Sequence, residues 1–262
     1  MRVPTIAALG FLLAAETARA VDVTECGQVI AAGQTGVLRQ NLTCGNRPTW
    51  PFSPEGVRLA PGAKLDLDGF SIEGNGSGVG VYCEGGRRAC TIKGPGEVRA
   101  FYAGVNCGGC RIVARDATFS DNVNGIYAPL SGTLQAKRVV ASDNTEMGIW
   151  THRLRVVDVE ANRNGLSGVT GNESLSLRGV EAVDNGDEGV RCLGFECGKT
   201  EIANSTITGN DAAGDGYDIA STGRVKLRNV TCSRSALLFY PFWEENDYDT
   251  VEVIGSFGCA DD

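Results

Sequence analysis

A short motif returns along the chain at nearly constant intervals, and it constrains the fold more than any other feature of the sequence. Residues 120–127 read SDNVNGIY, residues 142–150 read SDNTEMGIW, and residues 183–190 read VDNGDEGV. The asparagines that follow this pattern are spaced 22, 20, 21 and 25 residues apart, at Asn122, Asn144, Asn164, Asn185 and Asn210. Such a period is typical of a solenoid, in which each repeat buries its apolar side against the neighbouring repeats.

Within each repeat, short runs alternate between apolar and polar residues. The first run carries the apolar pairs Leu134/Ala136, Leu154/Val156 and Leu175/Leu177, and the second carries Val139/Ala141, Val159/Ala161 and Val180/Ala182. Alternation with period two indicates strands with one side inward, and no run has the length of a helix. Three short strands per repeat predict an all-β protein, a parallel β-helix. Leucine-rich repeats, the main alternative at this period, require a leucine pattern that is absent here.

The Asp-Asn and Gly positions of the motif are expected at the corners between strands. Asn and Gly tolerate the left-handed backbone conformation that a sharp turn requires. Stacked coils bring successive asparagines to about 4.8 Å, where their amides can form a hydrogen-bonded ladder. The motif is therefore interpreted as a corner device in which Asn122 serves the ladder, Gly125 the turn and Ile126 the core. Tyr127 is its outward-facing member.

The N-terminal segment has the features of an export signal. Arg2 supplies a positive charge, residues 4–15 are mostly apolar, and Ala18-Arg19-Ala20 is a small-x-small cleavage site. The apolar run is shorter than the roughly 20 residues that span a bilayer. Residues 1–20 are therefore expected to be a signal peptide, and the mature chain to be secreted, extracellular or periplasmic, without membrane insertion.

The ends of a solenoid need covers. We expect residues 21–55 to form an N-terminal cap and first coil, with a short amphipathic helix over residues 24–32, and residues 56–236 to form the coils. We expect residues 237–262 to form a C-terminal cap, because the aromatic run LLFYPFW breaks the repeat there. An exposed sugar-binding platform is the alternative for that run.

The cysteines fall into close pairs along the chain. An even number, 10, in an exported chain predicts disulfides, here Cys26/Cys44, Cys83/Cys90, Cys107/Cys110, Cys192/Cys197 and Cys232/Cys259. Cys107-Gly-Gly-Cys110 has the alternative of half a zinc or redox site, but the single histidine is distant and no second CxxC exists. Sequons at Asn41, Asn75, Asn172, Asn204 and Asn229 would make the chain a glycoprotein if its source is eukaryotic.

The charge of the chain is acidic overall, yet basic residues recur at one position of the repeat. The formal net charge of −8 disfavours nucleic acid and anionic membrane surfaces as partners. If the apolar strand residues point inward, their neighbours form outward columns, and these columns contain a basic stripe of Arg115, Lys137, Arg155, Arg178, Lys226 and Arg228. Such a stripe would suit an extended anionic polysaccharide.

Carboxylates accompany this stripe. Asp116, Arg138 and Asp158 fall on consecutive coils, and Asp116 and Asp158 are candidate ligands of a calcium ion that would also bind substrate carboxylates. Lys137, Arg138 and Arg155 are candidate bases for β-elimination, with His152 in reserve. The alternative is that these charges pair across strands and solvate a sheet surface.

Two aromatic residues form part of another outward column. Tyr127 and Trp150 follow the motif glycine on adjacent coils, and His152 lies two residues further on. Exposed aromatic rings are surfaces on which sugars stack, so these three residues are candidate substrate contacts. Packing under a loop is the alternative.

Several stretches resemble the right-handed parallel β-helix proteins of the pectate-lyase-like superfamily. They are the SDNxxxGI coils, the opening CGQVIAAGQTGVLRQNLTCG, and the segments GAKLDLDGFSIEG and CTIKGPGEV. The resemblance implies this fold over about residues 56–235. It does not imply one activity, because such folds include lyases, hydrolases, epimerases, adhesins and scaffolds. The Asn-Thr-Asp and Gly-His-Gly of polygalacturonase-like hydrolases and the Asp-Pro-His-Asp of mannuronan epimerases are absent here.

Three functions follow as hypotheses. The first is binding of an extracellular, acidic polysaccharide along the basic stripe. The second is a calcium-assisted lyase or epimerase acting on such a polymer. The third is a structural or adhesive surface protein in which the coils form a rigid rod.

Overall fold

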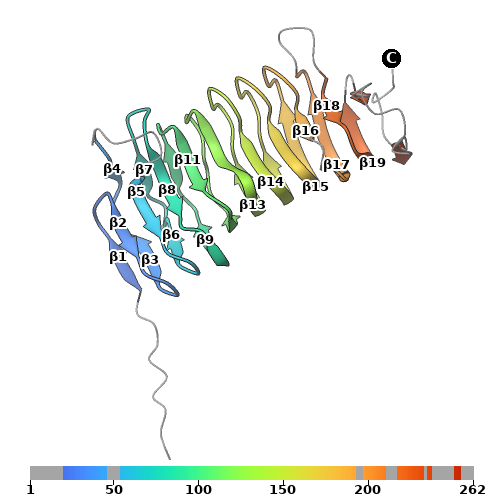
Figure 1. Ribbon diagram of the computed structural model, residues 1–262. Helices are drawn as coiled ribbons and strands as arrows, with labels where there is room; N and C mark the ends of the chain where they lie inside the picture. Colours follow the sequence, from blue (N-terminus) through green and yellow to red (C-terminus); the bar gives the residue numbers. More distant parts are fainter. Residues whose placement is uncertain are drawn as a thin grey trace, which may run out of the picture.

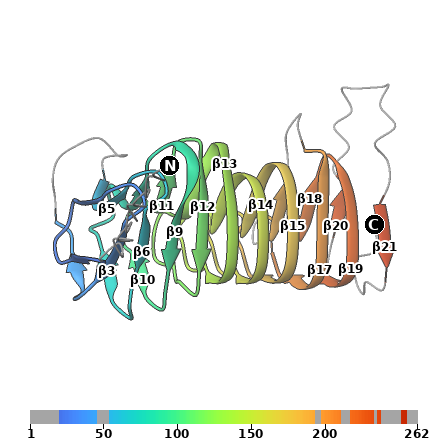
Figure 2. The ribbon, with the colours of Figure 1, turned by 90° about the horizontal axis from the view of Figure 1, so that it is seen from below.

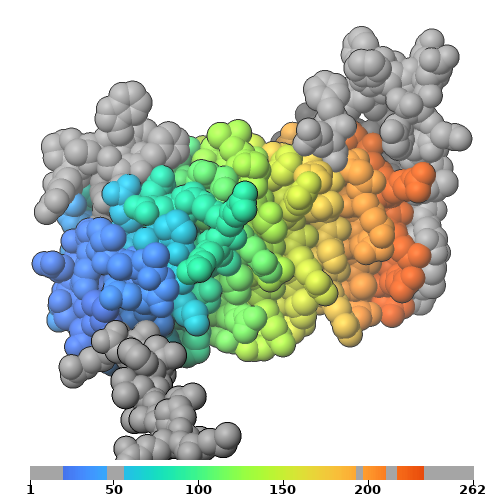
Figure 3. Space-filling model, turned by 60° about the horizontal axis from the view of Figure 1, so that its bottom comes forward, coloured from blue at the N-terminus to red at the C-terminus, as the bar shows by residue number. Residues whose placement is uncertain are grey.

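The chain winds into stacked coils that form a rod. The computed structural model describes residues 20–45, 54–192, 197–210, 217–232, 235–237 and 251–254. Successive coils lie side by side from β1 to β19 (Figure 1), and the space-filling view shows them as consecutive colour bands across one continuous surface (Figure 3). The described residues contain strands and no helix, so none of them forms a helix able to cross a membrane.

Each complete coil has three strand positions, and the paired strands run parallel. We name the three resulting surfaces faces I, II and III. Face I contains β1 (Val21–Val23), β3 (Thr35–Leu38), β6 (Lys64–Asp66), β9 (Gly86–Lys93), β12 (Cys110–Arg115), the middle of β13 (Asn124–Val140), β14 (Ile149–Glu160) and β15 (Val169–Val183), the start of β17 (Lys199–Thr208) and β19 (Arg224–Cys232), and β21 (Val251–Ile254). Several of these strands are in view in Figure 2.

The other two faces are built in the same way. Face II contains β2 (Gln28–Ile30), β5 (Pro54–Leu59), β8 (Val79–Cys83), β11 (Ala103–Cys107), the starts of β13, β14 and β15, β16 (Val190–Cys192), β18 (Ile219–Ser221) and β20 (Ser235–Leu237). Face III contains β4 (Leu42–Thr43), β7 (Ser71–Glu73), β10 (Glu97–Arg99) and the ends of β13, β14, β15, β17 and β19.

The core fills the inside of the coil with stacked apolar side chains. Leu134, Val139 and Ile126 of one coil are at most 1% exposed, and their registered neighbours on adjacent coils are buried in the same way. Phe101 and Phe119 are the largest fully buried side chains among the described residues. The alternation in the sequence therefore predicted the inward residues correctly, because each strand places every second side chain on one side.

The asparagine ladder is confirmed. The side-chain amide of each asparagine donates to the carbonyl oxygen of the next, over 2.9 Å from Asn144 to Asn164, 2.9 Å from Asn164 to Asn185 and 2.8 Å from Asn185 to Asn210. The backbone N–H groups of the same residues donate to the same oxygens. Asn122 joins the ladder through its backbone N–H, which donates to Asn144. The Asn210 amide donates over 2.8 Å to the buried carboxylate of Asp218, which ends the ladder.

The left-handed corner residues differ from the expectation. Positive φ angles occur at the residue before the ladder asparagine, with 56° at Asp121, 58° at Asp143 and 56° at Asp184, and not at Gly125. The glycine has another cause: a Cβ on Gly125 would lie 2.5 Å from the Gly148 carbonyl oxygen and 3.0 Å from the Asn144 amide nitrogen. Asp tolerates the left-handed region because its short side chain can bond locally, whereas the glycine makes room for the ladder.

The end caps are only partly described. The helix expected over residues 24–32 is wrong, because β2 lies there and pairs in parallel with β5 through Gln28↔Val57 and Ile30↔Leu59. The two β-branched residues at its end alternate, with Val29 exposed and Ile30 buried, and this favours a strand. The aromatic run and the signal segment lie outside the described residues, apart from their border residues.

The disulfides are confirmed where both partners are described: Cys26–Cys44, Cys83–Cys90, Cys107–Cys110 and Cys192–Cys197. The last three join the end of a face II strand to face I or to a residue shortly before it. Cys232 is also disulfide-bonded, and its expected partner, Cys259, lies outside the described residues. Cys83, Cys90 and Cys110 bring their sulfur atoms close together, but all three are disulfide-bonded and therefore do not form a zinc site.

Candidate functional site: a basic face

The predicted outward columns of face I are present in the predicted register. Arg115 pairs with Lys137, Lys137 with Val157, and Val157 with Arg178. The column continues through Ala203 to Arg228 and, in the other direction, to Lys93. A second column holds Gln135, Arg155, Ser176, Glu201 and Lys226 in direct register. Arg115 and Lys137 are therefore direct neighbours, whereas Val157 and Ala203 separate Arg178 from the next cations of its column.

A third column of face I adds cations that the sequence analysis missed. Arg111, Thr133, Arg153, Ser174, Lys199 and Arg224 are in register on successive coils. These residues lie two positions before the second column, so the same alternation that placed Arg115 and Arg155 would have found them. We call the outward side chains of the three columns, from β6 to β19, the basic face.

The charge on the basic face is one-sided. Between β6 and β19, its only carboxylates in the described strands are Asp66 and Glu201, which lie 2.7 Å from Lys93 and Lys199 respectively. The exposed cations Arg115, Lys137, Arg155 and Arg178 have no ion-pair partner among the described residues. Arg115 and Lys137 are directly opposite, an arrangement of like charges that destabilises a sheet in the absence of a counter-charge.

At the corner beside the basic face, in contrast, the charged side chains are paired with each other. Arg138 donates to Asp116 with both Nε and a terminal nitrogen, at 2.5 and 2.9 Å. The hydrogen bond and charge of Arg138 lower the pKa of Asp116 below its usual range. At the other edge of face III, Arg163 bonds Asp143 in the same two-pronged way. Charge pairing between coils, the alternative considered for the candidate calcium ligands and bases, is thus realised by Asp116 and Arg138, whereas Lys137 and Arg155 have no such pair among the described residues.

The calcium candidates are separated. Asp116, Arg138 and Asp158 occupy the same corner position on consecutive coils, each with positive φ. Asp116 and Asp158 are thus two coil spacings apart, about 9.6 Å, and the Arg138 coil lies between them. Both Asp116 oxygens accept from Arg138, so a calcium ion there would compete with this guanidinium. A calcium site that uses Asp116 and Asp158 stays a prediction.

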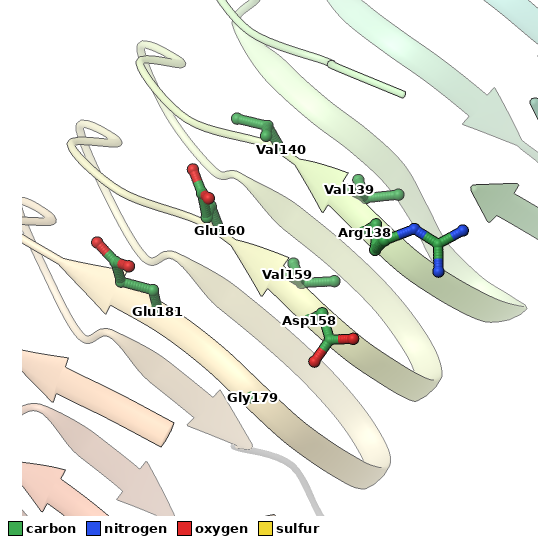
Figure 4. Close-up of a pocket in the computed structure, with 8 residues that line it drawn as sticks. All are labelled: Arg138, Val139, Val140, Asp158, Val159, Glu160, Gly179 and Glu181. Atoms are coloured by element: carbon green, nitrogen blue, oxygen red, sulfur yellow. The ribbon is translucent and has the colours of Figure 1, made fainter. Parts of the chain in front are cut away.

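A shallow groove adjoins this corner on face III. It is lined by Arg138, Asp158, Glu160, Glu181 and the valines between them. Glu160 and Glu181 point outward from neighbouring coils, and the Arg138 guanidinium extends away from them (Figure 4). Because Arg138 is bound to Asp116, its use as a base is a prediction that requires this pair to open, whereas Lys137 and Arg155 are exposed on the basic face.

The aromatic and histidine candidates do not join the basic stripe. Tyr127 and Trp150 lie in register on face II and pack edge to face, with ring centroids 5.3 Å apart and planes at 86°. His152 lies at the turn from face II to face I, where its Nε2 is 2.9 Å from Glu173 Oε2. Arg153 also bonds Glu173, and chiefly this bond lowers the pKa of that carboxyl. The sequence placed these residues in a separate column, and the coil geometry places that column on a different surface.

Comparison with known proteins agrees on the architecture. Among solved structures, a point mutant of the periplasmic alginate epimerase AlgG aligns with TM-score 0.50 and 14% identity, over 88% of this chain and 68% of that chain. The Dettilon tailspike protein aligns with TM-score 0.45 and 13% identity, over 82% and 47%. Pectate lyase Pel9A aligns with TM-score 0.37 and 14% identity, over 86% and 60%. At these identities the likeness concerns the fold alone.

The sequence matches a protein family but no individual curated protein. A search of curated protein sequences found no significant match. The family profile described as the right handed beta helix region matches residues 55–232. This match spans more than half of the chain and covers the stacked coils of the structure, so the chain belongs to the right-handed parallel β-helix family.

Proposed function

We propose that the protein binds an extended, anionic polysaccharide along the basic face. The observation that carries this proposal is the register of Arg115 and Lys137, two exposed cations directly opposite each other with no carboxylate within ion-pair distance among the described residues. Elsewhere on the coils, Arg138 and Arg163 face carboxylates on the neighbouring coil. An anionic ligand would supply to the basic face the counter-charge that the chain itself supplies at the corners.

The shape of the basic face favours a polymer over a small anion. Its columns run along the rod, with one strand about every 4.8 Å, from Lys93 to Arg228. Arginine and lysine bind carboxylates and sulfates in repeated, charge-assisted contacts. The periplasmic epimerase that shares the fold is named for alginate, an anionic polysaccharide, which is consistent with this ligand class.

The location of the protein is part of the proposal. The disulfides and the export-signal pattern of residues 1–20 support a chain that works in an oxidising compartment outside the cytoplasm, where such polymers occur.

Binding can be tested with a defined glycan panel. The mature protein is run in affinity electrophoresis through alginate, pectate, hyaluronan and dextran sulfate, with neutral dextran as the negative control. We expect retardation by at least one anionic polymer, weakening as salt is added, because exposed charges are screened. The double variant Lys137→Glu/Arg178→Glu should abolish it. The matched control Arg99→Glu/Arg163→Glu makes the same charge change on face III and at its corner and should retain binding.

The same panel separates the other functions. Calcium-dependent release of unsaturated sugars, followed by ultraviolet absorbance and lost in Lys137→Ala or Arg155→Ala, would show a lyase. Failure of all four anionic polymers to retard the protein at low salt would refute the binding proposal and favour a structural rod.

A further inference from the structure

Face II carries an aromatic surface that the basic face does not use. Tyr102, Tyr127 and Trp150 form a continuous series, with centroids 6.2 Å apart for the first pair and 5.3 Å for the second, both edge to face. Each ring is partly exposed. Trp150 is fixed in orientation because its indole N–H donates to Asn172 over 3.3 Å, and Asn172 in turn donates to the Pro129 carbonyl.

One acidic side chain, Glu146, lies near two of these rings. Glu146 is exposed, and its carboxylate accepts a hydrogen bond from Asn124 over 3.0 Å. Burial and the charge of Glu146 raise the pKa of Tyr102, and burial, Tyr102 and Glu146 raise that of Tyr127. The Glu146 charge therefore acts on both rings.

A second acidic group lies further along the same face. Arg191 is in register with Thr170, which is in register with Trp150. Arg191 is held by Asp187 at 3.0 Å and by Glu188 at 3.4 Å, so its charge is compensated. This part of face II is therefore not a cationic surface.

An unsatisfied hydroxyl lies at the edge of the rings. Thr170 is only 5% exposed, and its Oγ1 has no hydrogen-bond partner among the described residues. It follows Trp150 in the outward column, on the next coil. A buried hydroxyl without a partner costs free energy, but this oxygen lies beneath the surface and is therefore not counted among the groups that would contact a sugar.

We propose that the Tyr102–Tyr127–Trp150 surface is a second glycan-binding site, specific for neutral saccharides. The aromatic rings would stack against the apolar faces of sugar rings. The Glu146 carboxylate would accept hydrogen bonds from sugar hydroxyls, which are stronger than neutral ones because the acceptor is charged. The same carboxylate repels uronates and sulfates, so this site and the basic face select opposite ligands. The inference does not depend on the function proposed for the basic face.

The test is a calorimetric titration of the mature protein with cellohexaose, maltohexaose, mannohexaose and xylohexaose at millimolar concentrations. We expect at least one to bind. Trp150→Ala and Tyr127→Ala should weaken this binding about tenfold or more, the loss of one well-placed contact. Trp150→Phe, which keeps a ring, should retain most of the affinity and so distinguish a lost contact from misfolding. The indole NMR signal of Trp150, assigned with the Phe variant, should shift on titration.

Matched controls separate the two sites. Tyr82→Ala removes a ring from the same column on the far side of Asn106, where Arg58 lies 5.3 Å from the ring centroid, and should leave neutral binding unchanged. Lys137→Glu/Arg178→Glu should also leave it unchanged. Absence of binding by all four hexasaccharides would overturn the inference, as would binding that persists in both Trp150→Ala and Tyr127→Ala. Preferential binding of oligouronates, lost in Trp150→Ala, would disprove the specificity for neutral sugars.

Discussion

In the repeat that contains Asn144, two residues on either side of the ladder asparagine meet two different requirements. Asp143 takes the left-handed backbone conformation, with φ of 58°, and Gly148 leaves space for the next coil. A side chain on Gly148 would place Cβ 2.6 Å from the Gly168 carbonyl oxygen and 2.8 Å from the Asn164 amide nitrogen. Both neighbours are held by hydrogen bonds between coils, so they cannot easily move away.

Gly148→Ala is therefore expected to lower the free energy of unfolding by about 1–3 kcal/mol, the usual cost of overpacking. The measurement is denaturant unfolding followed by circular dichroism. Gly108→Ala is the matched control, because Gly108 is exposed and a Cβ there meets nothing within 4 Å. Equal stability of the two variants would contradict the packing role assigned to Gly148.

The Arg138–Asp116 ion pair, at the corner beside the basic face, predicts how the stability of the fold depends on pH. Arg138 lowers the pKa of Asp116, and a carboxyl with a lowered folded-state pKa stabilises the fold above its unfolded pKa. This contribution is lost as the pH falls through the lower, folded-state pKa. In Arg138→Ala the pKa of Asp116 should rise toward its unfolded-state value, measured by NMR of its carboxyl carbon. The free energy of unfolding should be lower near neutral pH, and the part of it that Asp116 loses as the pH falls should be smaller. If the Asp116 pKa stays unchanged in Arg138→Ala, the charges of Lys137 and Lys93 are enough to lower it.

At the scale of the strand and its turns, disulfides close several of the turns from face II to face I. Cys83 ends β8 and Cys90 lies in β9, seven residues later. Cys107–Cys110 makes the same connection on the next coil. Coils without such a bond turn through residues such as Thr151, which is fully buried and donates to the Arg153 carbonyl.

Removing one of these disulfides should lower the free energy of unfolding by an amount set mainly by the short loop that it closes. For Cys83→Ser/Cys90→Ser we expect the free energy of unfolding to fall by about 2–3 kcal/mol, because closing a loop of this size restricts the unfolded chain only modestly. Hydrogen exchange should show the loss concentrated at β8 and β9 and their neighbours, since solenoid coils contact mainly adjacent coils. A uniform loss of protection over all strands would argue against this local effect.

The strands also show which structural features the sequence reveals. Alternation predicted the inward residues and, with the asparagine spacing, the register that aligns Arg115 with Lys137. It did not predict β2, because two alternating residues, Val29 and Ile30, are too few to separate a strand from a helix. The alternation also did not predict which side chains bond to one another. The folded structure brings Arg138 to Asp116, while the described part of the chain offers Lys137 no such hydrogen-bonded partner.

At the scale of the whole molecule, the length of the basic face predicts how long a ligand must be to bind along all of it. From Lys93 to Arg228 its main column crosses six coil spacings, about 29 Å. Affinity for size-fractionated oligomers of the retained anionic polymer should rise with length until a ligand spans this distance and then level off. Calorimetry with each fraction measures this. Equal affinity for the shortest and longest fractions would show a single local pocket instead.

The asparagine ladder has a direction as well as a length. Each ladder amide from Asn144 to Asn210 donates toward the C-terminal end of the row, and Asn144 and Asn210 also donate to backbone carbonyls of the preceding coil. The bonds from amide to amide all point the same way, so the dipoles along the row align head to tail. Aligned dipoles add, and they leave a partial positive charge at their donor end. The carboxylate of Asp218 lies at that end, accepting from both the backbone and the side chain of Asn210. The row is thus electrically polarised, and an anion neutralises its positive pole as an acidic side chain does at the start of an α-helix.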